Sequence, residues 1–292
     1  MKIENRILVI AAFGVFLLSC KLDKVSMEAY SKGIEISANG IKAEQVYVTD
    51  GDKGIKSRQF KYAQKIFTNF EGISGFTVHE GKYYPEMEVL VVSKRGDTVF
   101  RQKNLFPKDT SFEVAQTALH GHLILANPMR SGEEYTAHYT LYDTKGKGSL
   151  NSAMDFVIVR DDHILVTPNG LDFNEAYLFS KTTEKALAEG KLYFDEESWM
   201  DFQGLRGYRI REGRASLGLS VLVTDDNGRA IVRQKDIFEG QTLDVQQLKA
   251  GVASTLHIGK GSLANPVRWK VRIWDKNSAA ELNAEAILEV VE

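Results

Sequence analysis

Apolar residues recur at every second position along most of the chain, rather than at every third or fourth. The stretches MEVLVVS (87–93) and GLSVLVT (218–224) are alternating, β-branched runs. Each is followed by a turn and by a second apolar run, which is the pattern of a β-hairpin. Helical periodicity is almost absent, and TTEKALAEG (182–190) is its best candidate, with one or two turns expected. The pattern predicts an all-β protein.

The chain contains two copies of one sequence unit. Residues 70–106 align without gaps on residues 202–238, and 13 of the 37 aligned positions are identical. The match continues upstream, where SANGIKAEQVYV resembles TPNGLDFNEAYL, and downstream, where LANPMR resembles LANPVR. An internal repeat of this length indicates that one structural unit occurs twice.

Each unit is expected to form one domain. We place the first β-sandwich repeat at 34–160 and the second at 161–292, with VRDDHI as a short junction. Short strands separated by regular turn signals predict two tandem homologous β-sandwich domains, immunoglobulin-like in layout. Closure of each unit into a barrel is the alternative.

The amino terminus has the composition of a secretory signal. Lys2 and Arg6 give a cationic start, residues 7–18 are uninterruptedly apolar, and the small residue Ser19 precedes Cys20. The apolar run is shorter than the roughly 20 residues that a membrane-spanning helix needs. The segment is therefore predicted to direct export rather than to fold with the rest of the chain.

The motif Leu17-Leu18-Ser19-Cys20 resembles the lipobox of bacterial lipoproteins, in which the signal is cut before the cysteine and the thiol receives a diacylglycerol. The resemblance implies a signal peptide at 1–19 and lipidation of Cys20. The residues after Cys20 show no clear period, so we expect a tether at 20–33. Cys20 is the only cysteine of the chain, so it has no disulfide partner within a monomer. An ordinary signal peptide with an incidental cysteine is the alternative.

The same resemblance bears on location. Lys21 follows the cysteine, whereas aspartate at this position is the familiar inner-membrane retention signal of some Gram-negative bacteria. The resemblance thus implies a lipid-anchored protein of the cell envelope, held in the outer membrane, with its periplasmic or surface face left open. Acyl chains stabilise such an anchor by about 0.8 kcal/mol per buried methylene.

Residues kept in both copies are expected to serve the shared fold rather than a ligand. Four glycine pairs are expected at turns or bulges, three aromatic pairs in the cores, and the two Asn-Pro steps in one shared turn. They are Gly72/Gly204, Gly75/Gly207, Gly81/Gly213 and Gly96/Gly228; Phe67/Trp199, Phe76/Tyr208 and Tyr142/Trp274; and Asn127-Pro128/Asn265-Pro266.

Aromatic residues without a counterpart are the candidates for binding. Tyr83 and Tyr84 align with alanine and serine in the second copy, and Trp269 replaces Ala137 of the first. Exposed rings of this kind stack on sugars or anchor protein interfaces. The alternative is that each ring fills a gap particular to its own domain.

His120 and His122 stand two residues apart, a spacing at which two imidazoles on one strand face could share a metal ion. We pair His120 with His257 of the second copy, which favours a structural role for it, and His122 with Gly259. His122 then carries the metal hypothesis alone, and our prediction is that no metal binds here.

Other chemical motifs are weak. Adjacent carboxylates such as Asp161-Asp162 would face opposite ways on a strand, and Asp225-Asp226-Asn227-Gly228 is predicted to be a turn rather than a calcium loop. Arg95-Gly96-Asp97 is expected at a hairpin tip without an adhesive role. The repeated Arg101-Gln102-Lys103 and Arg233-Gln234-Lys235 are either a solvated sheet edge or a contact made twice.

Composition excludes some classes of function. The net charge is −2 and no block of lysine and arginine is present, so nucleic acid is not an expected partner. No nucleophile elbow, phosphate-binding loop or dinucleotide motif occurs, so we expect no enzyme and no cofactor. The sequence predicts a non-catalytic envelope lipoprotein that binds a protein or glycan partner. A structural or assembly subunit is the alternative, and an enzyme of unidentified type comes third.

Overall fold

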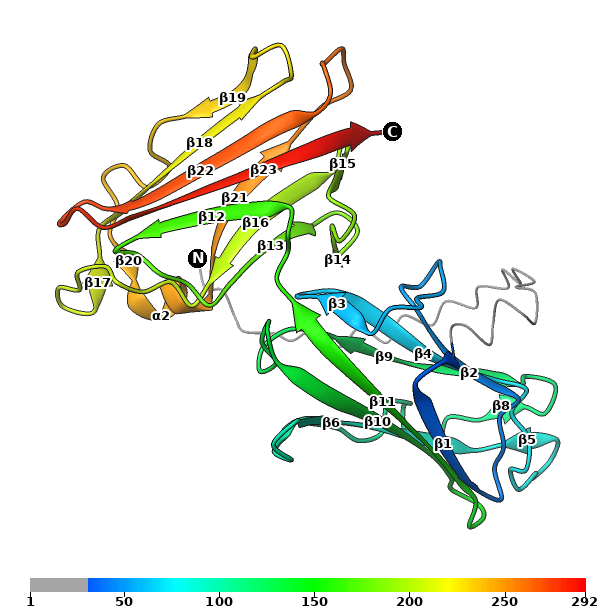
Figure 1. Ribbon diagram of the computed structural model, residues 1–292. Helices are drawn as coiled ribbons and strands as arrows, with labels where there is room; N and C mark the ends of the chain where they lie inside the picture. Colours follow the sequence, from blue (N-terminus) through cyan, green and yellow to red (C-terminus); the bar gives the residue numbers. More distant parts are fainter. Residues whose placement is uncertain (1–30) are drawn as a thin grey trace.

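The computed structural model describes residues 31–292, and its strands fall into two sets that share no sheet (Figure 1). Strands β1 to β11 form the first domain, and strands β12 to β23 form the second. The chain passes between them through residues 160–163, from β11 to β12. The predicted signal peptide and Cys20 lie outside the described residues. Among the described residues, no helix is long and apolar enough to cross a membrane.

The large sheet of the first domain is antiparallel in the order β1-β11-β10-β6-β7, and β3 adds a parallel pairing to β11. Its strands are β1 (Ile34–Asn39), β3 (Gln59–Lys61), β6 (Pro85–Ser93), β7 (Thr98–Gln102), β10 (Glu134–Asp143) and β11 (Ser149–Val159). Alternate residues of β6, β10 and β11 are buried, as the twofold apolar period predicts.

A small sheet in the order β2-β4-β9 packs against the large one and completes a sandwich. It consists of β2 (Gln45–Thr49), β4 (Lys65–Glu71) and β9 (Ala118–Ile124), and a separate short ladder joins β5 (Lys82–Tyr83) to β8 (Phe112–Glu113). The two sheets approach closely at Gly121, where an added Cβ would lie 2.7 Å from Met87 Sδ and from the ring of Tyr139.

The second domain repeats this architecture. Its large sheet has the order β12-β23-β22-β18-β19 with β15 parallel to β23, and its small sheet has the order β14-β13-β16-β21. The strands are β12 (Ile164–Asn169), β13 (Glu175–Ser180), β14 (Lys185–Ala186), β15 (Lys191–Tyr193), β16 (Glu197–Gln203), β17 (Arg214–Ala215), β18 (Leu217–Thr224), β19 (Ala230–Gln234), β20 (Leu243–Asp244), β21 (Val252–His257), β22 (Val267–Asp275) and β23 (Glu281–Val291). The predicted all-β sandwich class is therefore confirmed.

The helix predicted at 182–190 is wrong. This segment contains turns and the short strand β14, whereas the helix of the second domain is α2 (Val245–Ala250). The Asp244 carboxylate caps α2 by accepting hydrogen bonds from the backbone N–H groups of Gln246 and Gln247.

The repeated glycines adopt backbone conformations that favour glycine, as predicted. All four predicted pairs have positive φ in both domains. Gly75 and Gly207 are the most constrained pair, because a Cβ on either would lie 2.1 Å from a backbone carbonyl oxygen, that of Gly40 or of Gly170. The two Asn-Pro bonds are both cis, at Asn127-Pro128 and Asn265-Pro266, so these steps also adopt one conformation in both copies.

The repeated aromatic residues are less deeply placed than the repeat predicts. Phe76 and Tyr208 are partly buried against the two cores. Phe67 and Trp199, however, lie on the outer faces of the small sheets, where alternate positions turn away from the core. Tyr142 is 40% exposed on β10. A position kept in both copies thus marks a shared site in the fold, which can be a sheet surface as well as a core.

We predict that Gly207→Ala destabilises the protein by about 3 kcal/mol, because the new methyl group meets a carbonyl oxygen and the left-handed backbone is itself unfavourable. Gly228→Ala is the matched control. Gly228 has a similar positive φ of 78° but open space around its Cβ position, so it should cost about 1 kcal/mol. Urea unfolding of both variants measures the difference, and equal costs would contradict the steric explanation.

Candidate functional site

Tyr83 is a core residue and not an exposed ring. It is 5% exposed, and its ring lies 4.8 Å from that of Phe76 and 5.7 Å from that of Phe112. Its hydroxyl donates to the Gln116 carbonyl at 2.6 Å, and burial raises its pKa to about 12. The expectation of an exposed Tyr83 is wrong, because the ring packs against Phe112, its partner in the β5–β8 ladder, and against Phe76.

Trp269 is also buried, with 0% exposure, in the core of the second domain. Its indole N–H donates to Ser254 Oγ at 3.2 Å. Trp269 therefore fills a gap in the core of its own domain, as the alternative interpretation predicted. Of the three candidate rings only Tyr84 is partly exposed, with Lys145 Nζ 5.1 Å from its ring centroid. The three rings form no common binding surface.

The two histidines of the first domain do share a strand face. His120 and His122 point outward from β9, and both lie near the Phe67 ring, at centroid distances of 5.7 and 5.9 Å. Partial burial and then the nearby charge of Lys65 lower the pKa of both imidazoles, so both are neutral at pH 7.

The pairing of His120 with His257 is wrong. In the first domain His120 stands opposite Asn69 and His122 opposite Phe67. In the second domain the corresponding positions of β16 are Asp201 and Trp199, and they stand opposite Ala253 and Thr255. His257 instead faces Glu197. Neither histidine of β9 therefore has a counterpart, and both are particular to the first domain.

These residues belong to a larger outer surface, which we call the imidazole face. It consists of the outward-pointing residues of β2, β4 and β9, on the side of the small sheet away from the core. They are Gln45, Tyr47, Thr49, Lys65, Phe67, Asn69, Glu71, Ala118, His120, His122 and Ile124. Ile124 is 52% exposed, and the Tyr47 hydroxyl donates to Glu71 Oε1 at 2.5 Å.

The corresponding face of the second domain is a docking surface for the first domain. Tyr62 Oη accepts from the Asn127 N–H and donates to Gln203 Oε1, both at 2.8 Å. Gln203 Nε2 in turn donates to Tyr177 Oη, which donates to Asp201 Oδ2. The rings of Tyr62 and Tyr177 lie 5.3 Å apart. A continuous chain of hydrogen bonds therefore joins the domains.

A second contact reinforces this joint. The Ser131 N–H and hydroxyl donate to the two carboxylate oxygens of Glu175, at 2.9 and 2.6 Å. Glu175 is 5% exposed, so both its oxygens need partners. Ser131 lies in the segment 129–134, which separates the cis-proline from Tyr135 of β10, whereas the corresponding Val267 of β22 directly follows Pro266 in the second domain. The first domain therefore has an additional segment here, which the second domain lacks, and this segment contributes to the joint.

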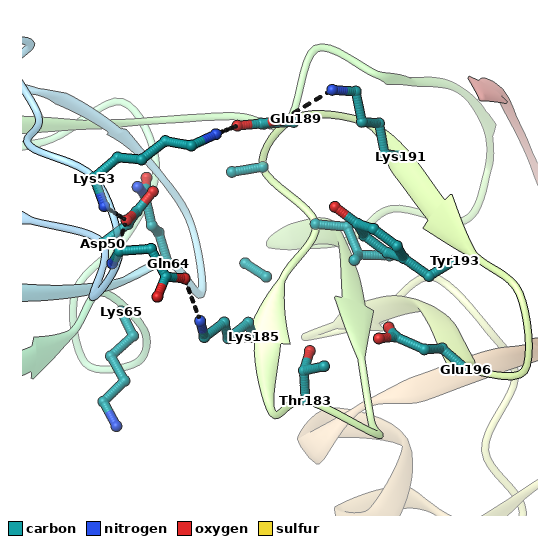
Figure 2. A pocket seen from close by; sticks show the side chains of 14 residues that line it. Asp50, Lys53, Gln64, Lys65, Thr183, Lys185, Glu189, Lys191, Tyr193 and Glu196 are labelled. Carbon is teal, nitrogen blue, oxygen red and sulfur yellow. Dashed lines mark hydrogen bonds and ion pairs between the residues drawn. The ribbon is translucent and has the colours of Figure 1, made fainter. Parts of the chain in front are cut away.

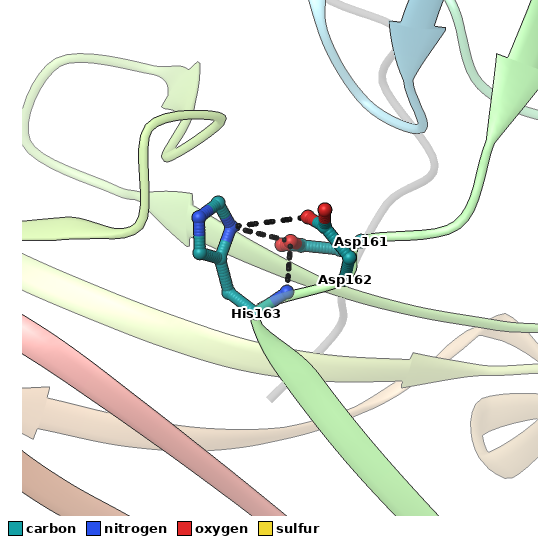
Figure 3. A group of neighbouring side chains, drawn as sticks. All are labelled: Asp161, Asp162 and His163. Atoms are coloured by element: carbon teal, nitrogen blue, oxygen red, sulfur yellow. Dashed lines mark hydrogen bonds and ion pairs between the residues drawn. The ribbon is translucent and has the colours of Figure 1, made fainter.

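The junction itself holds a cluster of charges (Figure 3). Asp161 is 6% exposed and accepts from His163 Nδ1 at 2.9 Å, and ligand atoms of Asp161, Asp162 and His163 lie within 4.8 Å of one another. The two carboxylates do not diverge as on a strand, because they lie in a turn, and both contact the Lys61 ammonium of the first domain. That ammonium supplies the positive charge that a metal ion would bring.

A cleft of about 290 Å³ lies between the domains, beside the joint (Figure 2). Two ion pairs span it, Lys53 with Glu189 at 3.6 Å and Lys185 with Asp52 at 3.1 Å. Lys65 lines one end of the cleft and also belongs to the imidazole face, so the two surfaces are continuous.

Two polar motifs lie at the edge of the large sheets. Arg95-Gly96-Asp97 occupies the turn between β6 and β7 and is exposed. The repeated Arg-Gln-Lys triplets end β7 and β19, which are edge strands in both domains, and Arg101 Nε donates to Glu88 at 2.6 Å. The solvated-edge interpretation of the triplets fits this position.

No family model matches the chain, and no curated protein matches it in sequence. Among solved structures, one titled pT26-6p is 7% identical with a TM-score of 0.28, over 92% of this chain and 69% of that one. A β-glucuronidase of Bacteroides uniformis is 8% identical with a TM-score of 0.25, and a β-galactosidase described as putative from Bacteroides fragilis is 9% identical with a TM-score of 0.23. Each alignment covers 87% of this chain but only 32% and 41% of those enzymes. Such likeness assigns no family and no activity.

We predict that Tyr62→Phe loosens the joint. The change deletes a hydroxyl that accepts from Asn127 within the first domain and donates to Gln203 of the second, at a cost of about 1 to 2 kcal/mol. Limited proteolysis at residues 160–163 should become faster than in the wild type. Tyr47→Phe is the matched control, since its hydroxyl bonds only within the first domain. Cleavage that is equally fast in wild type and Tyr62→Phe would show that this hydroxyl does not hold the joint.

We predict a pH dependence of stability from the two β9 histidines. Their folded pKa values lie below the ordinary 6.5, so the unfolded chain binds protons first as the pH falls. The free energy of unfolding should therefore decrease below pH 6.5. The variant His120→Asn/His122→Asn should lose less stability between pH 7 and 5, measured by urea unfolding at each pH, than wild type or the control His257→Asn. An unchanged slope in the double variant would refute the assignment.

Proposed function

We propose that the protein is a non-catalytic lipoprotein of the bacterial cell envelope whose two β-sandwich domains bind a protein or glycan partner. The lipobox-like Leu17-Leu18-Ser19-Cys20 supports the anchor and, through Lys21, the outer membrane. Nothing in the sequence favours nucleic acid as a partner. The supporting observation for binding is the imidazole face, an outer sheet surface on which Ile124 is 52% exposed and whose counterpart in the second domain is a docking surface.

The arrangement of the domains fits binding better than catalysis. The joint fixes one domain against the other through Tyr62, Ser131 and Lys61, so the cleft between them has a defined shape. The group of histidine and carboxylates found among the described residues, at Asp161 to His163, is occupied by a lysine ammonium and serves the joint. A preformed cleft beside an aromatic surface is the usual form of a binding site.

A structural or assembly role is the second candidate, and a specific surface favours it. Leu165 on β12 is 71% exposed, and Ile287 on the neighbouring β23 is 50% exposed. Leu165 stands opposite Glu285, two residues from Ile287, so the two side chains share the outer face of the sheet. An exposed apolar pair beside an edge strand suits a contact with another envelope protein.

We predict that the anchor depends on Cys20. In cells fed a palmitate analogue, the wild-type protein should be labelled and should sediment with the membranes, because acyl chains on the thiol hold it there. Cys20→Ala should lose both properties. Ser26→Ala, which lies outside the lipobox-like motif, is the control and should behave as the wild type. Labelling of Cys20→Ala at the wild-type level would refute the anchor.

A further inference from the structure

Lys65 is placed to receive an anion. Its Nζ lies 5.2 Å from the centroid of the Phe67 ring, and no carboxylate of the described residues forms an ion pair with it. The other three cleft lysines, Lys53, Lys185 and Lys191, are already paired across or beside the cleft. Within the described chain, Lys65 is therefore the cleft cation whose charge a ligand can neutralise.

The imidazoles beside Lys65 supply further donors. His120 and His122 are neutral, and a neutral imidazole offers one N–H group. Together with the neighbouring Phe67 ring, they form a surface that is partly apolar and partly hydrogen-bonding. Pyranose rings have the same mixed character, with an apolar C–H face and hydroxyl groups at the rim, and they pack on aromatic rings.

The charged side chains that line the cleft next to Lys65 balance one another. Its lining contains four carboxylates and four lysines, together with the amide of Gln64 and the hydroxyls of Thr183 and Tyr193. Tyr193 is 38% exposed. Such a lining disfavours guests of high charge, and it offers side-chain donors and acceptors beside the apolar Ala186, Leu187 and Ala188. The volume is close to the lower end of the roughly 300 to 1,000 Å³ of small-molecule sites, which suits one sugar ring.

We propose that the cleft and the imidazole face together bind an acidic oligosaccharide. One sugar ring lies in the cleft, and the carboxylate of a neighbouring uronic acid pairs with Lys65 while its ring packs beside Phe67. This inference rests on the proposed binding function and names its ligand class. An acidic peptide is the other source of carboxylates. The surface favours the saccharide, because one available cation serves a single carboxylate and the cleft donors suit hydroxyl groups.

The test uses isothermal titration calorimetry with the mature protein lacking its lipid. The probes are tetragalacturonate and its fully methyl-esterified form, which keeps the rings and removes the charge. We expect the acid to bind at least about tenfold more tightly than the ester, and less tightly as salt rises. Lys65→Gln should weaken binding of the acid about tenfold, and Thr183→Val should weaken binding of both probes.

Lys103→Gln is the control, since Lys103 is an exposed lysine just beyond β7, on the large sheet rather than on the imidazole face. It should bind as the wild type, and thermal unfolding shows that each variant is folded. Equal affinity for acid and ester, wild-type affinity in Lys65→Gln, or no binding of either saccharide would overturn the inference. Binding of pentaglutamate that requires Lys65, without saccharide binding, would also overturn it, while leaving a protein partner and the proposed function in place.

Discussion

The hydrogen-bonded joint between the domains is the constraint on which the rest of the arrangement depends. Tandem β-sandwich domains connected by a few residues would otherwise be free to reorient, because interfaces between domains are commonly small and polar. Here Tyr62, Gln203 and Tyr177 form a directional chain, and the buried carboxylate of Glu175 has both oxygens satisfied by Ser131. A buried carboxylate left without donors is costly, so the contact has one favourable geometry.

The joint also explains how two copies of one fold diverged. The outer face of a small sheet is used in both domains, but the second domain commits it to the first through Tyr177 and Gln203. In the first domain Tyr47 and Glu71 occupy the corresponding positions and bond to each other. Their polar groups are satisfied locally, and the rest of that face is free to vary. The two imidazoles particular to the first domain, His120 and His122, are found there.

The sequence predicted the architecture well, because twofold apolar periodicity and the gapless repeat both reflect the backbone. The prediction of binding residues failed, because a residue without a counterpart in the other copy can have two physical causes. Tyr83 and Trp269 lack counterparts because each fills its own core, whereas His120 and His122 lack counterparts on an outer face. A sequence difference does not distinguish these cases. The alternation of buried and exposed positions along a strand does, once the register is known.

The residues of the joint were missed for a different reason. Ser131 lies in the added segment 129–134, and a length difference between the copies at the turn after Pro128 was the available signal. The similarity of LANPMR and LANPVR concealed this difference in length. An alignment on these two motifs pairs Met129 with Val267, so that the added segment 129–134 no longer shows as an insertion. Strand pairing places Tyr135 opposite Ser93 in the first domain and leaves Val267 to begin β22 in the second.

Lys65 was missed for another reason, because a single lysine on a polar strand face belongs to no sequence motif. Its significance comes only from the second domain, which closes a cleft beside it and leaves its charge without a carboxylate among the described residues.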